Sequence, residues 1–213
     1  MSRLRSLLLA IFAVWMVSTS ASASALEFFV HHVLLQGLLN VETTLRSASA
    51  ILKGETAGVK VEITCSGEHT SGWIHNGSNG SGVSLGLGLG KVHFLQCVVS
   101  EPESEHCQIA NELLLASALI ALGSIAAETY ALFSPDPTGV PFTKFTFEGC
   151  KQSALNVTFN VTGEVAGLVE DRTSSLDFKE GAPNNKLRFA GNPATILGEG
   201  LILMEGGGAI EVL

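Results

Sequence analysis

Apolar and polar residues alternate over many short stretches of the chain. The pattern is clearest over residues 59–65 and 155–162, and it recurs around 92–94, 145–147 and 187–189. Alternation with a period of two places apolar side chains on one face of a β-strand and polar side chains on the other. Short strands separated by Gly, Pro and Asn turns predict an all-β domain, sandwich- or barrel-like, of mostly antiparallel strands.

Two longer apolar segments do not follow this alternation. Residues 26–52 and 112–133 are rich in Leu and Ala, which favour helix by intrinsic propensity. The second segment is apolar on every face, and periodicity cannot distinguish a buried helix from a strand buried on both faces. Gly123 divides it into two lengths that each suit such a strand. Helix and strand therefore both remain open for these segments.

The first 25 residues have the pattern of a signal peptide. Arg3 and Arg5 precede an uncharged apolar run over residues 7–17, and small residues with overlapping A-x-A sites follow over 18–25. This apolar run is too short to span a bilayer, which takes about 20 residues. We therefore expect a signal peptide at 1–25 and a single β-rich domain at 26–213. The product is expected to be secreted, extracellular or associated with the cell wall, with no membrane span after cleavage.

Composition indicates a folded, acidic domain. Hydrophobic residues make up 46% of the 213 residues and charged residues 15%, which is typical of globular chains rather than disordered ones. The formal net charge is −8, and loss of Arg3 and Arg5 with the signal would make it −10. A surface of this charge disfavours nucleic acid and anionic lipid as partners.

The chain contains four cysteines, Cys65, Cys97, Cys107 and Cys150. In an exported chain, four cysteines without C-x-x-C or zinc-site spacing predict two structural disulfides. Three pairings are possible. Cys97 and Cys107 flank an acidic turn around Pro102, which favours a local bridge across that hairpin and leaves Cys65 to pair with Cys150.

Familiar catalytic motifs are incomplete in this sequence. Residues 82–86 match G-x-S-x-G around Ser84, but glycines follow where a helix is required, and the only later histidines are His93 and His106. Residues 86–91 (GLGLGK) lack the spacing of a phosphate-binding loop or a dinucleotide fingerprint. Alternating Gly and Leu instead predicts a strand with one face of bare backbone, against which another element packs closely. We expect no catalytic residues and no cofactor.

The histidines are poorly spaced for a metal site. His31 and His32 are adjacent and would point to opposite faces of a strand, while His69 and His75 lie on either side of Trp73 in a Gly/Ser-rich segment. Neither pair chelates a metal without distant ligands. No metal site is expected.

Two further hypotheses about function each come from a single feature. Glu170 and Asp171 are the only adjacent acids, and a small secreted hydrolase with a carboxylate-based site is the alternative function. The Gly-rich stretch 82–90 suggests β-strand addition to a partner, if this strand lies at an exposed sheet edge.

Cysteine and turn motifs follow one another in a definite order along the chain. They comprise Ile63-Thr-Cys65, Gly72-Trp-Ile, Phe94-Leu-Gln-Cys97, the acidic loop to Cys107, Phe133-Ser-Pro135, Phe147-Glu-Gly-Cys150, Val161-Thr-Gly163 and Leu187-Arg-Phe-Ala-Gly191. Their order and spacing resemble secreted, cysteine-containing, β-rich proteins of soil actinobacteria, a group without an established function. The resemblance implies a disulfide-bonded secreted domain in which residues 112–133 are extended. It implies no activity and no site residues.

These observations predict a secreted or cell-surface binding or structural module of unknown ligand, without catalytic machinery. A cell-wall polymer and a surface protein are the candidate partners.

Overall fold

Strands dominate the structure, as the alternation predicts. The computed structural model describes residues 26–78, 84–110, 115–125, 127–136, 140–170, 173–182 and 186–213. The predicted signal peptide, residues 1–25, lies outside the described residues and stays a prediction. The strands are β1 (Phe28–Val30), β2 (Val33–Leu34), β3 (Leu39–Leu45), β4 (Ala50–Thr56), β5 (Val59–Ser78), β6 (Ser84–Glu101), β7 (Gln108–Ile109), β8 (Leu115–Ile125), β9 (Glu128–Pro135), β10 (Thr143–Glu148), β11 (Thr158–Thr162), β12 (Val165–Val169), β13 (Ser175–Phe178), β14 (Arg188–Phe189), β15 (Asn192–Pro193), β16 (Thr195–Met204) and β17 (Glu211–Val212), with two short 3-10 turns, η1 (Glu103–Glu105) and η2 (Ser153–Leu155).

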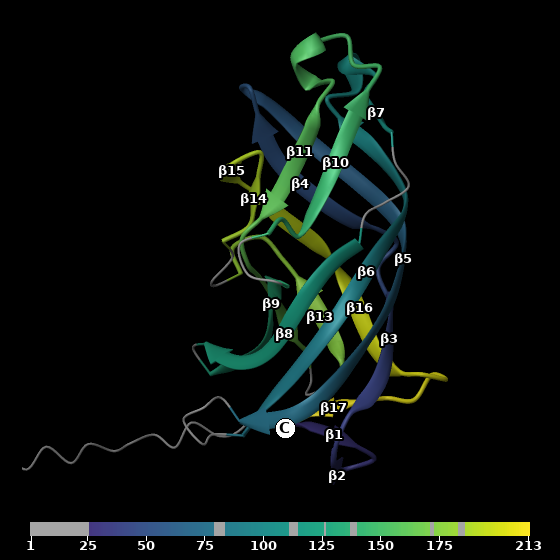
Figure 1. Ribbon diagram of the computed structural model, residues 1–213, viewed down its shortest axis with the longest axis vertical. Helices are drawn as coiled ribbons and strands as arrows, with labels where there is room; N and C mark the ends of the chain where they lie inside the picture. The colour runs from purple at the N-terminus through teal and green to yellow at the C-terminus, as the bar shows by residue number, and fades with distance from the viewer. Residues whose placement is uncertain are drawn as a thin grey trace, which may run out of the picture.

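Antiparallel strands from the described part of the chain close into an eight-stranded barrel. The strand order is β13, β12, β9, β8, β6, β5, β3 and β16, and β16 pairs back with β13. β4 continues the place of β3, because it pairs with residues 59–65 of β5 and 195–197 of β16, whereas β3 pairs with residues 70–74 and 200–204. Figure 1 shows β5 and β6 as long strands running along the barrel. The predicted all-β, sandwich- or barrel-like fold is confirmed as a barrel.

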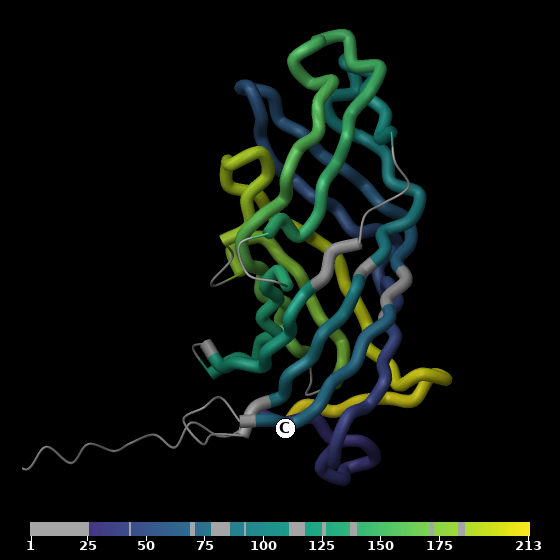
Figure 2. The backbone as a smooth tube through the Cα atoms, in the orientation of Figure 1, coloured from purple at the N-terminus to yellow at the C-terminus, as the bar shows by residue number. Residues whose placement is uncertain are grey.

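Smaller sheets lie at the two ends of the barrel. β7, β10, β11, β14 and β15 form one sheet, and β1, β2 and β17 form the other. In Figure 2 the green hairpin of β10 and β11 reaches one end of the molecule, and the purple N-terminal strands lie at the opposite end. Asn76 of β5 holds β1 in place, since its side chain accepts a hydrogen bond from Phe28 N (2.8 Å) and donates one to Phe28 O (2.9 Å).

Two clusters of buried side chains fill the interior. The first, here called the aromatic core, lies toward β10 and β11 and contains Phe145, Phe147, Phe159 and Phe189 together with aliphatic neighbours and three cysteines. Its rings are in mutual contact, with centroids 5.2 Å apart for Phe147–Phe159 and for Phe159–Phe189. The second, here called the aliphatic core, fills the opposite half of the barrel with Phe28, Val41, Ile74, Ile120, Leu122, Ala131, Val169, Leu176, Ile202, Ile210 and Val212. Phe133 packs against both.

The inward face of β5 changes between the two cores. Val61, Ile63 and Cys65 are buried on the side of the aromatic core, whereas Ile74 is buried in the aliphatic core, so the inward positions change from odd to even numbers. β6 changes face opposite this point, where Gln96 has a positive φ of 51°. Such an irregularity lets one continuous strand serve two sections of a barrel.

The Gly-Leu alternation produces the expected bare face. Gly86, Gly88 and Gly90 are buried, while Leu87 and Leu89 between them are half-buried. A Cβ added at Gly86 would collide with the side chains of Leu122 and Phe28. The prediction of close packing against this strand is therefore confirmed.

The predicted presence of two disulfides is confirmed, but the favoured pairing was wrong. The bridges join Cys65 to Cys97 and Cys107 to Cys150. Cys65 and Cys97 are directly opposite each other on the neighbouring strands β5 and β6, with Cα atoms 4.0 Å apart. The acidic turn is therefore not closed on itself. Cys107 instead reaches across to Cys150, which follows β10, and ties this turn to the end sheet.

The two apolar segments are extended. Residues 26–52 contain β1, β2, β3 and the start of β4, and the described part of 112–133 forms most of β8 and β9. The division is not at Gly123, which lies inside β8, but beside Ala127, whose φ of 68° fits the turn. No helix in the described residues is long and apolar enough to cross a membrane.

Candidate functional site

An apolar cavity of about 140 Å³ lies inside the barrel between the two cores. Aliphatic side chains from both cores line it, among them Leu52 and Ile63 from the aromatic core and Ile120, Leu176 and Ile202 from the aliphatic core. The cavity lies where the pairing of β5 passes from β3 to β4. At the same level, β5 and β6 change the face that points inward. The offset between the two cores therefore leaves space that neither core fills.

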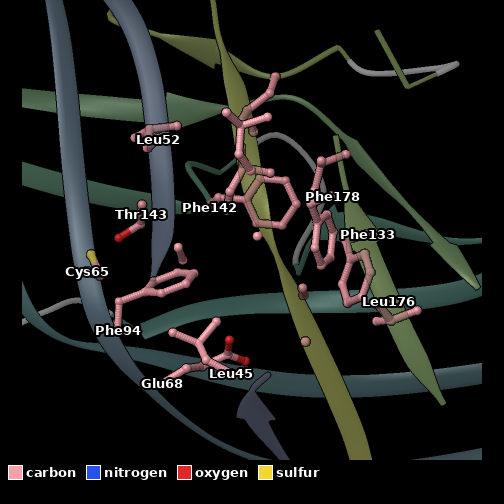
Figure 3. A pocket seen from close by; sticks show the side chains of 18 of the residues that line it. Leu45, Leu52, Cys65, Glu68, Phe94, Phe133, Phe142, Thr143, Leu176 and Phe178 are labelled. Carbon is pink, nitrogen blue, oxygen red and sulfur yellow. The ribbon is translucent and has the colours of Figure 1, made fainter. Parts of the chain in front are cut away.

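Phenylalanine rings form much of the remaining wall. Phe94, Phe133, Phe142, Phe145 and Phe178 all line the cavity. The rings of Phe133 and Phe178 are 5.5 Å apart between centroids, within the range of favourable aromatic pairs. Figure 3 shows these two rings on one side of the cavity and Phe94 and Thr143 on the other. An aromatic or aliphatic molecule would make apolar contacts on every side.

Two glycines leave part of the wall contributed by β16 without side chains. Gly198 and Gly200 line the cavity, and a Cβ added at Gly200 would meet no heavy atom within 4 Å. Ala50 and Ala118 are also buried small residues in the lining. Small residues at these positions leave open the space that larger inward side chains would occupy.

Two lining residues bring polar side chains to this apolar surface. Glu68 of β5 pairs directly with Phe94 of β6 and is half-buried. Thr143 begins β10 and is only 8% exposed. The Thr143 Oγ1 atom has no hydrogen-bond partner within the described part of the chain. Glu199 also borders the cavity. It is the neighbour of the inward Gly200 on β16, and its backbone lies opposite that of Asp177 on β13 in the strand register.

The carboxylate hypothesis placed Glu170 and Asp171 in a catalytic site. Glu170 instead accepts a hydrogen bond from the Ser175 hydroxyl at 3.2 Å and lies 3.9 Å from the Arg46 guanidinium, away from the cavity lining. Asp171 lies outside the described residues. The hydrolase alternative, with a site around Glu170 and Asp171, stays a prediction.

The serine-hydrolase motif has the wrong surroundings in this fold. Ser84 begins β6, and the glycines after it continue the same strand instead of opening a helix. Gly82 lies outside the described residues. The expected strand-turn-helix context of a nucleophilic serine is therefore not formed.

The hypothesis of strand addition along residues 82–90 is contradicted over residues 87–90. β6 pairs with β5 over residues 84–101 and with β8 over residues 87–93, so both edges are occupied. Over residues 87–90 the closed barrel therefore leaves no free edge for a partner strand.

Metal binding finds no support in the side-chain arrangement. Within the described ranges, no group of three or more His, Cys, Asp or Glu residues is arranged to hold a metal ion. His32 instead lies 2.7 Å from the Glu211 carboxylate at the end of the barrel, and His75 stacks beside Trp73 with centroids 5.3 Å apart.

One titratable group outside the cavity has a strongly shifted pKa. The Tyr130 hydroxyl donates a hydrogen bond to the Glu128 carboxylate at 2.6 Å. This bond, burial of the ring and the negative charge of Glu128 together raise the pKa of Tyr130 to about 12. Each effect favours the neutral phenol, so the group is a structural contact rather than an acid or base near neutral pH.

Comparison of the chain with protein-family models, with curated proteins and with solved structures gives no match. The cavity therefore carries the functional argument by its own geometry. No motif in the sequence predicted the cavity, although small residues at inward positions, such as Ala118, Gly198 and Gly200, were its signal. That signal could be interpreted only once the inward face of each strand was known.

Proposed function

We propose that this protein is a binding protein that holds one small, predominantly apolar molecule inside its barrel. The observation that carries the proposal is the apolar cavity of about 140 Å³ between the two cores. Eight-stranded barrels have interiors that either fill with side chains or hold one small ligand. A cavity of comparable volume, about 150 Å³, engineered into another protein's core stays dry and binds benzene.

The persistence of the cavity also supports the proposal. Empty apolar space in a core costs stability in proportion to its volume, at about 24 cal/mol per Å³ in a measured series. Larger side chains at Ala118 or Gly200 would reduce that cost, and Gly200 has open space where its side chain would be. A binding role gives a reason for keeping these positions small.

We further propose that the protein acts outside the cytoplasm. Two disulfides support this location, because structural disulfides form and persist in oxidising compartments. The apolar character of the cavity favours a small hydrophobic ligand over a wall polymer, whose polar sugars would need hydrogen-bonding partners.

Toluene binding tests the proposed function. Ala118 and Ala121 lie on the same strand, with Ala118 in the cavity lining and 3% exposed, whereas Ala121 is in the alternate outward register. We expect calorimetric titration to detect toluene binding to the unchanged protein, Ala118→Leu to weaken it at least about tenfold, and Ala121→Leu to leave it unchanged. Urea unfolding of both variants verifies that each is folded. Absence of toluene binding, or equal effects of the two substitutions, would contradict the proposal.

A further inference from the structure

We infer that the ligand carries a hydroxyl group that hydrogen-bonds with the Thr143 side chain, so that the cavity selects small alcohols or phenols over pure hydrocarbons. This inference rests on the proposed function and specifies its ligand class. The observation behind it is the unpartnered Thr143 Oγ1 atom in the wall of an otherwise apolar cavity.

Thr143 is unusual among the polar side chains on β10. Thr146 lies on the other face of this strand, and its hydroxyl pairs with that of Thr158 across the sheet at 2.8 Å. Thr143 points inward with Phe145, and both are buried. A valine of nearly the same shape would fill this position without burying an unsatisfied hydroxyl, and such burial is unfavourable.

Other buried hydroxyl groups in the described residues show how this protein normally satisfies them. Ser175 is 2% exposed, yet its hydroxyl donates to Glu170 and accepts from Arg46 at 3.1 Å. Thr143 has no such neighbour within the described ranges, and its position in the lining makes a bound molecule the available partner.

Water is a poor substitute for that partner. A buried water typically makes about three hydrogen bonds to polar groups. The inward lining offers the Thr143 hydroxyl and the acidic Glu68 side chain amid phenylalanines, aliphatic side chains and glycines. A molecule with an apolar body and one hydroxyl fits this distribution, because the body contacts the rings while the hydroxyl meets Thr143.

The charge of the lining selects against an anionic head group. Glu68 is acidic, and the whole chain has a formal net charge of −8. A carboxylate or phosphate would lose its hydration in an apolar space without a basic residue to compensate, since none of the lining residues is Lys or Arg. The hydroxyl group of an alcohol or phenol is neutral and carries both a donor and an acceptor.

Phenol and toluene form a suitable probe pair, because they share nearly the same shape and differ in a hydroxyl against a methyl group. The variants are Thr143→Val, which removes the inward hydroxyl, and Thr146→Val, which removes the outward one. For Thr143→Val we expect phenol affinity to fall about five- to tenfold while toluene affinity is retained. Thr146→Val should change neither affinity.

Unfolding of the ligand-free protein gives an independent readout. Thr143→Val should raise the urea midpoint, because it removes an unsatisfied buried hydroxyl at nearly constant volume. Equal losses of phenol and toluene affinity, or no change in either, would overturn the inference while leaving the proposed function intact. Failure of both probes to bind the unchanged protein would instead overturn the proposed function itself.

Discussion

The two halves of the interior are built differently from the same barrel. In the aromatic core the rings of Phe147, Phe159 and Phe189 are in edge-to-face and tilted contact, and both disulfides border this core. The aliphatic core packs branched side chains around Phe28 without a cysteine among its described members. The cavity opens between them, where the strands change their inward face.

The two halves of the interior therefore differ in the contacts that stabilise them. The small residues Ala118, Gly198 and Gly200 lie in the cavity wall between these two halves. A cavity persists only where its surroundings do not relax into it. Substitutions in the cores, in a disulfide, in the strands and at Tyr130 test this contrast.

Phe147→Ala should destabilise the protein by about 3–5 kcal/mol, because Phe147 is 1% exposed and contacts two other rings. Phe178→Ala should cost about 1–2 kcal/mol, since this half-buried ring borders empty space and loses fewer contacts. Urea unfolding measures both values. Val98→Ala, at a position 57% exposed, is the control and should stay within about 0.5 kcal/mol. An equal loss in the free energy of unfolding for the two variants would contradict the distinction between the tightly packed aromatic core and the cavity wall.

Loss of one cross-link should have the next largest effect. The double variant Cys107→Ala, Cys150→Ala opens a loop with a sequence separation of 43 and should lower the free energy of unfolding by about 2–4 kcal/mol. Toluene binding should survive at temperatures where the variant is folded, since neither cysteine lines the cavity. Peptide mapping of the unreduced protein provides the matching structural check. A peptide joining Cys97 to Cys107 would disprove the pairing described above.

Gly72 of β5 and Gly200 of β16 should respond differently to an added methyl group. A Cβ at Gly72 would collide with Leu89 O and lie 2.9 Å from Gly90 Cα, so Gly72→Ala should cost about 1–3 kcal/mol. Gly200→Ala meets open space and should change stability by less than about 0.5 kcal/mol. Thermal unfolding of both variants measures the two changes in stability. A loss at Gly72 alone would show that the backbone is crowded at Gly72 and that the cavity wall is open at Gly200. Similar destabilisation at the two positions would mean that the space at Gly200 is not open in solution.

The smallest effect concerns Tyr130, the one tyrosine of the chain, which makes its titration directly visible in the tyrosinate absorbance. The midpoint should lie near pH 12 in the folded protein and move toward 10 in Glu128→Gln, which loses the charged acceptor. Because the folded pKa lies above the unfolded one, the stabilisation is fully present below pH 10 and is lost as the pH rises through 12. A midpoint that is the same in Glu128→Gln would show that burial alone causes the shift.

The alternating patterns over residues 59–65 and 155–162 indicated the fold class, although the second strand begins only at Thr158, after the 3-10 turn Ser153–Leu155. Side chains alternate on a strand, so a half-buried strand leaves a period of two in the sequence. The Gly-Leu alternation over 86–90 likewise determined a bare strand face, because a missing Cβ is a property of the residue and not of its surroundings. The count of four cysteines, without C-x-x-C or zinc-site spacing, predicted two bridges.

Only the tertiary structure decided which cysteines pair and where the cavity lies. Cys65 and Cys97 are 32 residues apart, and they meet because β5 and β6 pair in one particular register. Thr143 looks like an ordinary strand residue until the barrel places it against an apolar space with no partner in the described chain. Register, closure and the offset between the two cores depend on contacts between distant segments. No local pattern encodes those contacts, so the binding cavity is a property of the folded chain.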